Sequence, residues 1–193
     1  MVPLADIGDE LLSLMGAAAF DVLQSIPPAV SLVQQRYMLT QQVAIFERKH
    51  RLHVTLDYAM TMADALMELQ ESASRAGVSM TRAQLRALMP NDFAQHWRDA
   101  LEFLAILTDT WPAIEQEMGM ITTTARELRL MDALAAHWAL HPPPFWVYAV
   151  GSTASQSATA QLLKTIATME KGAVILPGVD PLMDAAEWTS ISV

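Results

Sequence analysis

The chain contains no cysteine among its 193 residues, which excludes disulfide bonds, zinc–thiolate sites, iron–sulfur clusters and cysteine nucleophiles. Charged residues make up only 17% of the chain and hydrophobic residues 52%, a balance that excludes a disordered protein and favours one with a packed core. No uncharged apolar run approaches the ~18 residues of a transmembrane helix. The start of the chain lacks the basic and apolar regions of a secretory leader. We therefore expect a cytoplasmic protein with no membrane contact.

Positive charge is scarce: 12 Lys and Arg residues face 21 Asp and Glu residues, for a net charge of −9. Because nucleic-acid binding depends on cationic contacts to phosphate, we do not expect the chain alone to bind DNA tightly. Its clustered basic residues are interpreted as solvated surface, with phosphate contact as the alternative. They are Arg48, Lys49, Arg51, Arg82 and Arg86.

Glycine is limited to seven residues, and none of them precedes a lysine, so the phosphate-binding loop of ATPases is absent. The segment GSTASQ (residues 151–156) follows an expected strand and precedes an expected helix, where α/β proteins often hold an anion. We favour a polar turn in which Ser155 or Ser157 caps the helix. The segment has no carboxylate to hold Mg²⁺, so it does not support nucleotide hydrolysis.

Histidines offer one spacing of interest, His137 and His141, which are four residues apart. Pro142 disfavours helical geometry at His141, and imidazoles near a helix C-terminus suit the helix dipole without a metal. His50 and His53 are interpreted as solvated. We assign no metal site to any of them.

Acidic residues Asp180, Asp184 and Glu187 cluster where a final helix is expected to begin, and capping of that helix is the favoured explanation. The sequence contains no H-E-x-x-H and no G-x-S-x-G motif. We therefore assign no catalytic, cofactor-binding or metal-ligating residue.

Apolar residues at a period near 3.6 predict helices over residues 29–50, 55–75, 81–89 and 123–140, and a long helix from residue 91 that Pro112 kinks or divides. The residues expected to face inward from the first two helices are Val30, Val33, Tyr37, Val43, Phe46, Leu56, Met60, Ala63, Leu66, Met67 and Leu69. Methionines and tryptophans lie mostly on such stripes, so we interpret them as core.

The pattern changes after Pro142–Pro144: a strand at 145–150, a helix at 157–169 and a strand at 173–176 predict a βαβ unit with two parallel strands. The predicted fold class is mostly α with a partial α/β layer, divided into a helical bundle (residues 1–141) and a partial parallel α/β segment (residues 142–193). Two parallel strands do not make a stable sheet, so we expect the sheet to be incomplete.

Three segments resemble the AddB subunit of the bacterial double-strand break repair helicase–nuclease in its alphaproteobacterial form. Residues 147–188 (VYAVGSTASQSATAQLLKTIATMEKGAVILPGVDPLMDAAEW) are similar to its strand, its G-S-T-x-S-x-x-A-T loop and its V-x-L-P-G-x-D segment. Residues 91–114 (NDFAQHWRDALEFLAILTDTWPAI) and residues 3–12 (PLADIGDELL) are similar to upstream parts of the family. The similarity covers nearly the whole chain.

The resemblance implies a degenerate relative of ATP-dependent helicases. Where active relatives carry a Walker B Asp-Glu pair, this chain has Gly151 and Ser152, and their nucleotide-sensing segment reads Pro177-Gly178-Val179-Asp180 here. The family's phosphate-loop position and its nuclease region, with metal-binding carboxylates and cluster cysteines, are not in this sequence. The expectation is a truncated, non-catalytic helicase-like fragment.

As a scaffolding and DNA-holding segment, this fragment would act with an AddA-type helicase–nuclease subunit, contact DNA only within that complex, and need no cofactor. The alternative is a stand-alone helical protein-interaction module unrelated to repair. An enzyme that binds a small anion at Gly151 is the weaker third hypothesis.

Overall fold

The computed structural model of the chain describes residues 14–16, 19–50, 54–87, 95–152 and 156–178. Its elements are α2 (Ala19–Ser25), α3 (Leu32–His50), α4 (Leu56–Arg75), α5 (Arg82–Ala87), α6 (Gln95–Ala105), η3 (Ile106–Thr110), α7 (Trp111–Met118), α8 (Thr123–Leu140), β1 (Val147–Val150), α9 (Ser157–Thr168) and β2 (Gly172–Ile175). This confirms the predicted fold class, mostly α with a partial α/β layer. The final helix predicted after Asp180 lies outside the described residues.

Local hydrogen bonds and backbone conformations set the limits of α4 and the start of α5. The Thr55 hydroxyl accepts a bond from the Tyr58 amide at the start of α4, and Gly77 adopts φ +67° just after its end, a conformation that glycine tolerates best. Before α5, the Thr81 side chain accepts from the Gln84 amide while the Gln84 side chain accepts from the Thr81 amide.

The long helix predicted from residue 91 is divided by one turn of π-helix. In η3 the Trp111 amide donates to the Ile106 carbonyl, five residues back. Pro112 follows directly as the second residue of α7; it has no amide hydrogen, which the first turn of a helix tolerates. Of the two predicted outcomes, a kink or a division, the structure has a division, and it is a π turn directly before Trp111 and Pro112.

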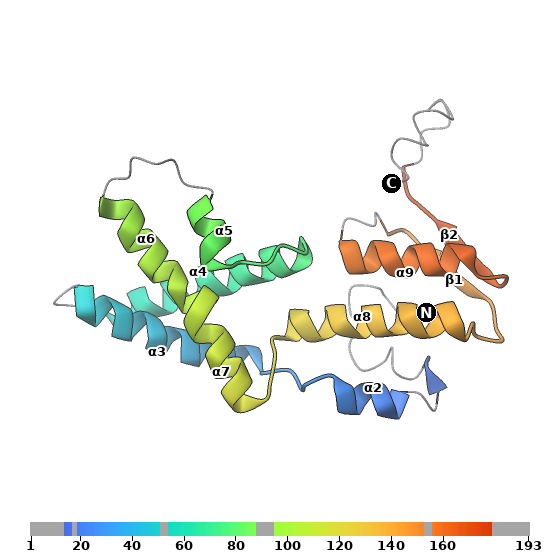
Figure 1. The fold of residues 1–193 in the computed structure, drawn as a ribbon, viewed down its shortest axis with the longest axis horizontal. Coiled ribbons are helices and arrows are strands. Elements are labelled where there is room, and N and C mark those ends of the chain that lie inside the picture. Colours follow the sequence, from blue (N-terminus) through green and yellow to red (C-terminus); the bar gives the residue numbers. More distant parts are fainter. Residues whose placement is uncertain (1–13, 17–18, 51–53, 88–94, 153–155, 179–193) are drawn as a thin grey trace.

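The two strands are parallel and pair in register from Val147 with Gly172 to Val150 with Ile175. They form a two-stranded sheet, and α9 connects them and packs on one face, with α8 lying against α9 (Figure 1). The predicted βαβ unit is confirmed.

The elements form two groups that lie side by side in Figure 1, and each group has its own hydrophobic core. One gathers α2, α8, α9 and the sheet around residues such as Leu134, Trp138 and Leu162; the other gathers α3, α4, η3 and α7 around residues such as Leu39 and Trp111. Helix α8 thus shares its core with the α/β segment. The boundary after residue 141 stays a prediction, but the buried residues do not divide there.

The predicted inward stripes are partly wrong. Val30, Val43, Ala63 and Leu66 are buried as expected. The side chains that are exposed instead are Val33 (78%), Tyr37, Leu56 (70%) and Leu69. Their spacing is helical, but the packed neighbours cover a different face of α3 and only the middle of α4. Among the described helices, none is long and apolar enough to cross a membrane.

Candidate functional site

The loop after β1 is where the sequence offered an anion-binding site as an alternative to a polar turn. Gly151 has φ +80°, and its amide donates to the Ile175 carbonyl at 3.0 Å, so this amide closes the sheet and is not directed at a ligand. Helix α9 begins at Ser157 after Gln156, which makes no capping side-chain bond. The prediction of Ser157 as the cap is therefore wrong, and Ser155 lies outside the described residues.

His137 and His141 meet at the end of α8, where their rings stack with centroids 5.2 Å apart. His141 has already left helical geometry, with φ −134°, as Pro142 predicts. No cluster of three His, Asp or Glu residues in the described part of the chain is arranged to hold a metal ion.

The C-terminal end of α3 carries an ionic cluster that corrects one prediction. His50 stacks on Phe46 at 4.4 Å between ring centroids, and its Nε2 lies 3.4 Å from Glu102 on α6, so it is not simply solvated. Lys49 donates to the same carboxylate at 3.0 Å. The hydrogen bond from Lys49 is the largest influence on Glu102 and lowers its pKa, and the charge of Lys49 acts in the same direction. The cluster ties α3 to α6, which is a structural role.

The other basic residues do not act as one phosphate-binding group. Arg82 pairs with Asp109 of η3 at 3.3 Å, while Arg86 is exposed on α5 and Arg48 on α3. Arg51 and His53 lie outside the described residues, as do Asp180, Asp184 and Glu187.

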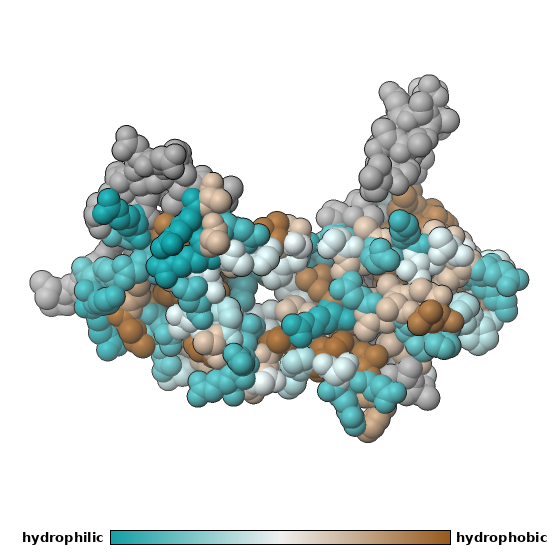
Figure 2. Space-filling view, in the orientation of Figure 1, coloured by the Kyte–Doolittle hydropathy of each residue, from teal (hydrophilic) through white to brown (hydrophobic). Residues whose placement is uncertain are grey.

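The sheet carries the first of two apolar surfaces. Ala149 points into the core below, but its neighbours Tyr148 and Val150 are 62% and 61% exposed, and Ile175 on β2 is 56% exposed. Trp146 stacks on Tyr148 at 5.9 Å and extends the same surface, which we call the open sheet face (Tyr148, Val150, Ile175 with Trp146). Figure 2 shows hydrophobic residues gathered at the C-terminal end of β2.

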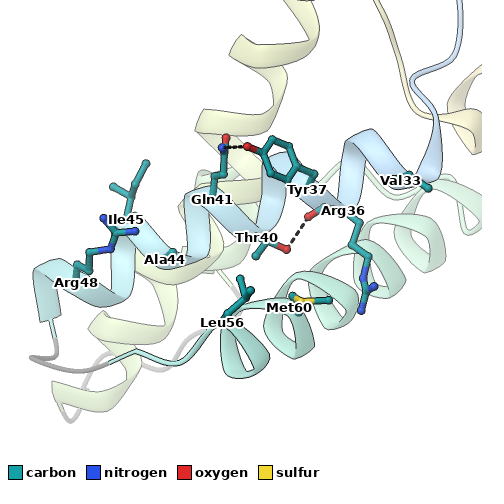
Figure 3. A pocket seen from close by; sticks show the side chains of 10 residues that line it. All are labelled: Val33, Arg36, Tyr37, Thr40, Gln41, Ala44, Ile45, Arg48, Leu56 and Met60. Carbon is teal, nitrogen blue, oxygen red and sulfur yellow. Dashed lines mark hydrogen bonds between the residues drawn. The ribbon is translucent and has the colours of Figure 1, made fainter.

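The second apolar surface is a groove of about 660 Å³ between α3 and α4, shown in Figure 3. We call it the α3–α4 groove. Its lining is Val33, Arg36, Tyr37, Thr40, Gln41, Ala44, Ile45, Arg48, Leu56 and Met60. Tyr37 is held by a bond from the Gln41 side-chain amide at 2.7 Å, while Leu56 and Met60 supply the α4 side.

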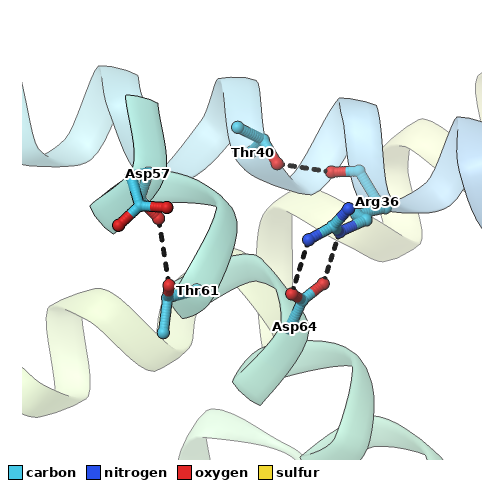
Figure 4. A network of polar contacts seen from close by, with 5 residues as sticks. All are labelled: Arg36, Thr40, Asp57, Thr61 and Asp64. Carbon is cyan, nitrogen blue, oxygen red and sulfur yellow. Dashed lines mark hydrogen bonds and ion pairs between the residues drawn. The ribbon is translucent and has the colours of Figure 1, made fainter. Parts of the chain in front are cut away.

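A bidentate ion pair fixes the two walls of this groove. The Arg36 guanidinium donates to both carboxylate oxygens of Asp64, at 2.6 and 2.7 Å (Figure 4). The bond raises the pKa of Arg36 and lowers that of Asp64, so both stay charged. The Thr40 hydroxyl donates to the Arg36 carbonyl at 2.7 Å.

No family model, curated protein or solved structure matches this chain. Function must therefore be argued from the motifs and the two surfaces. Neither surface was assigned from the sequence, although a signal for the groove is present. Helix α3 buries Gln35 and Glu47 while it exposes Val33, Tyr37 and Ile45, so it carries apolar residues on two faces.

Proposed function

We propose that this chain is a non-catalytic, helicase-like segment of a double-strand break repair helicase–nuclease of the AddB type, which binds a partner protein through the open sheet face and contacts DNA only within the complex. The motif resemblance supports the class of machine. The single observation that carries the binding role is the exposure of Tyr148, Val150 and Ile175 on a parallel sheet.

Parallel sheets are normally covered on both faces and contain several strands. Here α9 covers one face, and no third strand pairs with β1 or β2 in the part of the chain that the structure describes. A strand added beside either edge would pair with edge backbone groups, and a covering element would bury the open sheet face. The sheet therefore has the properties of a unit completed by a partner.

The residues after β1 support a non-catalytic role. Nucleotide hydrolysis needs a carboxylate that holds Mg²⁺ and orients water beside the phosphates. Gly151 and Ser152 stand at that strand end, and the Gly151 amide is bonded to β2. In this proposal the chain contributes a contact surface and the backbone of the sheet, while the partner subunit carries out nucleotide hydrolysis.

The test is reconstitution with a purified AddA-type helicase–nuclease subunit, followed by sedimentation and an ATPase assay. We expect a stoichiometric complex that Val150→Lys weakens, and no ATP turnover by the chain alone. Leu56→Lys, an equally exposed apolar position in the α3–α4 groove, is the matched control and should bind like the wild type. Metal-dependent turnover by the isolated chain, or a complex that depends on Leu56 and not on Val150, would contradict the proposal.

The alternative function, a stand-alone helical interaction module, is favoured by a different observation, the α3–α4 groove. It predicts that the AddA-type subunit does not bind and that the chain recognises another protein through its helices.

A further inference from the structure

We propose that the α3–α4 groove binds an amphipathic, acidic α-helix of a partner protein. The inference is independent of the repair function, because it is carried by helices α3 and α4 and by none of the residues of the open sheet face.

The first step is that helix α3 carries apolar residues on two sides. Its inner side packs Leu39 and Val43 into the core and also holds Gln35, which donates to Gln70 at 3.0 Å. Its outer side presents Val33 and Ile45 to solvent. The inner side already supplies the core contacts of α3, so its apolar outer face is better explained by a ligand than by folding.

The second step is the shape of the groove. Its α3 lining recurs every three or four residues from Val33 to Arg48, which corresponds to about 22 Å of helix at about 1.5 Å per residue. Leu56 and Met60 repeat at four residues on the opposite wall. The Arg36–Asp64 pair holds the walls in place. A helix of about four turns lying along α3 matches this length and spacing.

The third step is charge. The chain carries a net charge of −9, yet the groove is lined by two arginines and no carboxylate. Arg36 is neutralised by Asp64, whereas Arg48 is exposed and forms no ion pair with any residue that the structure describes. An acidic side chain on the bound helix would form an ion pair with the Arg48 guanidinium. Nucleic acid is disfavoured, because its binding needs several free cations along the backbone.

The test uses a display library of peptides of about 18 residues, helical by design, with one apolar stripe and a polar face of glutamate, glutamine or lysine. We expect selection on the full chain to enrich glutamate. The best acidic peptide is then synthesised with a fluorescent label, and its affinity is measured by anisotropy.

Two substitutions separate the apolar and the charged contributions. Leu56→Glu should weaken the acidic peptide by roughly tenfold or more, as expected for loss of an apolar anchor. Arg48→Glu should weaken it by roughly fivefold, and a peptide with lysine in place of the facing glutamate should recover affinity for this variant only. Val150→Glu on the open sheet face is the matched control and should bind as the wild type does. Circular dichroism confirms that each variant is folded.

Several results would overturn the proposal. They are a selection that enriches no peptide or enriches lysine, peptide binding that Leu56→Glu leaves intact, and binding that Val150→Glu abolishes. Self-association of the chain that Leu56→Glu removes would assign the groove to a second copy instead, and would also overturn it.

Discussion

Glu115 lies half-buried on α7, where its Oε1 accepts a hydrogen bond from the Thr122 amide at 3.1 Å. Burial is the largest influence on it and raises its pKa above the ordinary value of 4.5, against the opposing effects of Trp111, Thr122 and Arg129. The folded protein therefore holds this proton more tightly than the unfolded chain does. A raised folded pKa contributes stability that is fully present below the unfolded value and is lost as the pH rises through the folded one.

We expect Glu115→Gln to remove this pH dependence. At neutral pH the variant should unfold at the same or a higher urea concentration than the wild type, because it keeps an oxygen for the Thr122 amide and buries no charge. Below the unfolded pKa the two proteins should differ least. Urea unfolding measured across this pH window gives the comparison, with Glu117→Gln, an exposed glutamate of the same helix, as the control. Parallel pH profiles for wild type and variant would refute the assignment.

Thr122 supports the same junction with its side chain. Its hydroxyl accepts from the Ala125 amide at 3.2 Å and caps α8, the helix that packs on α9. We expect Thr122→Ala to lower the free energy of unfolding by about 1 kcal/mol, while Thr122→Ser, which keeps the hydroxyl, loses less. Chemical denaturation of the three proteins tests the cap. Equal losses for Ala and Ser would assign the effect to the methyl group.

At the level of elements, the connection from α9 to β2 depends on one glycine. A Cβ on Gly172 would lie 1.8 Å from the Ile166 carbonyl oxygen in the last turn of α9. This is a steric clash with backbone atoms, so the backbone would have to move. Gly172 also pairs with Val147 in the sheet. We expect Gly172→Ala to cost about 1–3 kcal/mol or more, whereas Glu170→Ala on the exposed turn should be nearly neutral. Thermal unfolding of both variants measures the difference, and an unchanged midpoint for Gly172→Ala would contradict it.

The limits of the elements were predictable from sequence because local chemistry sets them. Thr55, Gly77 and Pro112 act through bonds or backbone conformations within a few residues of themselves, and they lie at or next to the limits of α4 and α7. The strands were recognisable from short apolar, β-branched runs between glycine and proline.

The faces of the elements were less predictable. A stripe such as Val33 and Tyr37 on α3 shows that a helix has an apolar side, but it does not show whether the rest of the chain covers that side. His50 was misjudged for a related reason, since Phe46 and Glu102 come together with it only through helix packing. Both surfaces proposed for binding thus arise from tertiary packing.

For the whole molecule, the two hydrophobic cores do not follow the order of the elements along the chain. Helix α8 is continuous with the bundle in sequence, yet Leu134 and Trp138 are buried with Leu162 of α9. Arg126 also donates to the Ile26 and Pro27 carbonyls, which brings the segment after α2 onto α8. Packing of this kind between distant segments has no local signature, so the pairing of the two halves required the structure.

The open sheet face gives the last prediction. Exposed apolar residues on a parallel sheet that has only two strands in the described part of the chain favour association with other chains, since association buries the face and pairs the edge. We expect the purified chain to self-associate increasingly with concentration, as measured by light scattering and sedimentation. Val150→Lys should shift the protein toward monomer by placing a charge on the face, whereas Leu56→Lys in the α3–α4 groove should not. A wild-type chain that stays monomeric and folded at every concentration would show that this face needs no cover, and it would remove the main structural support for a segment completed by a partner.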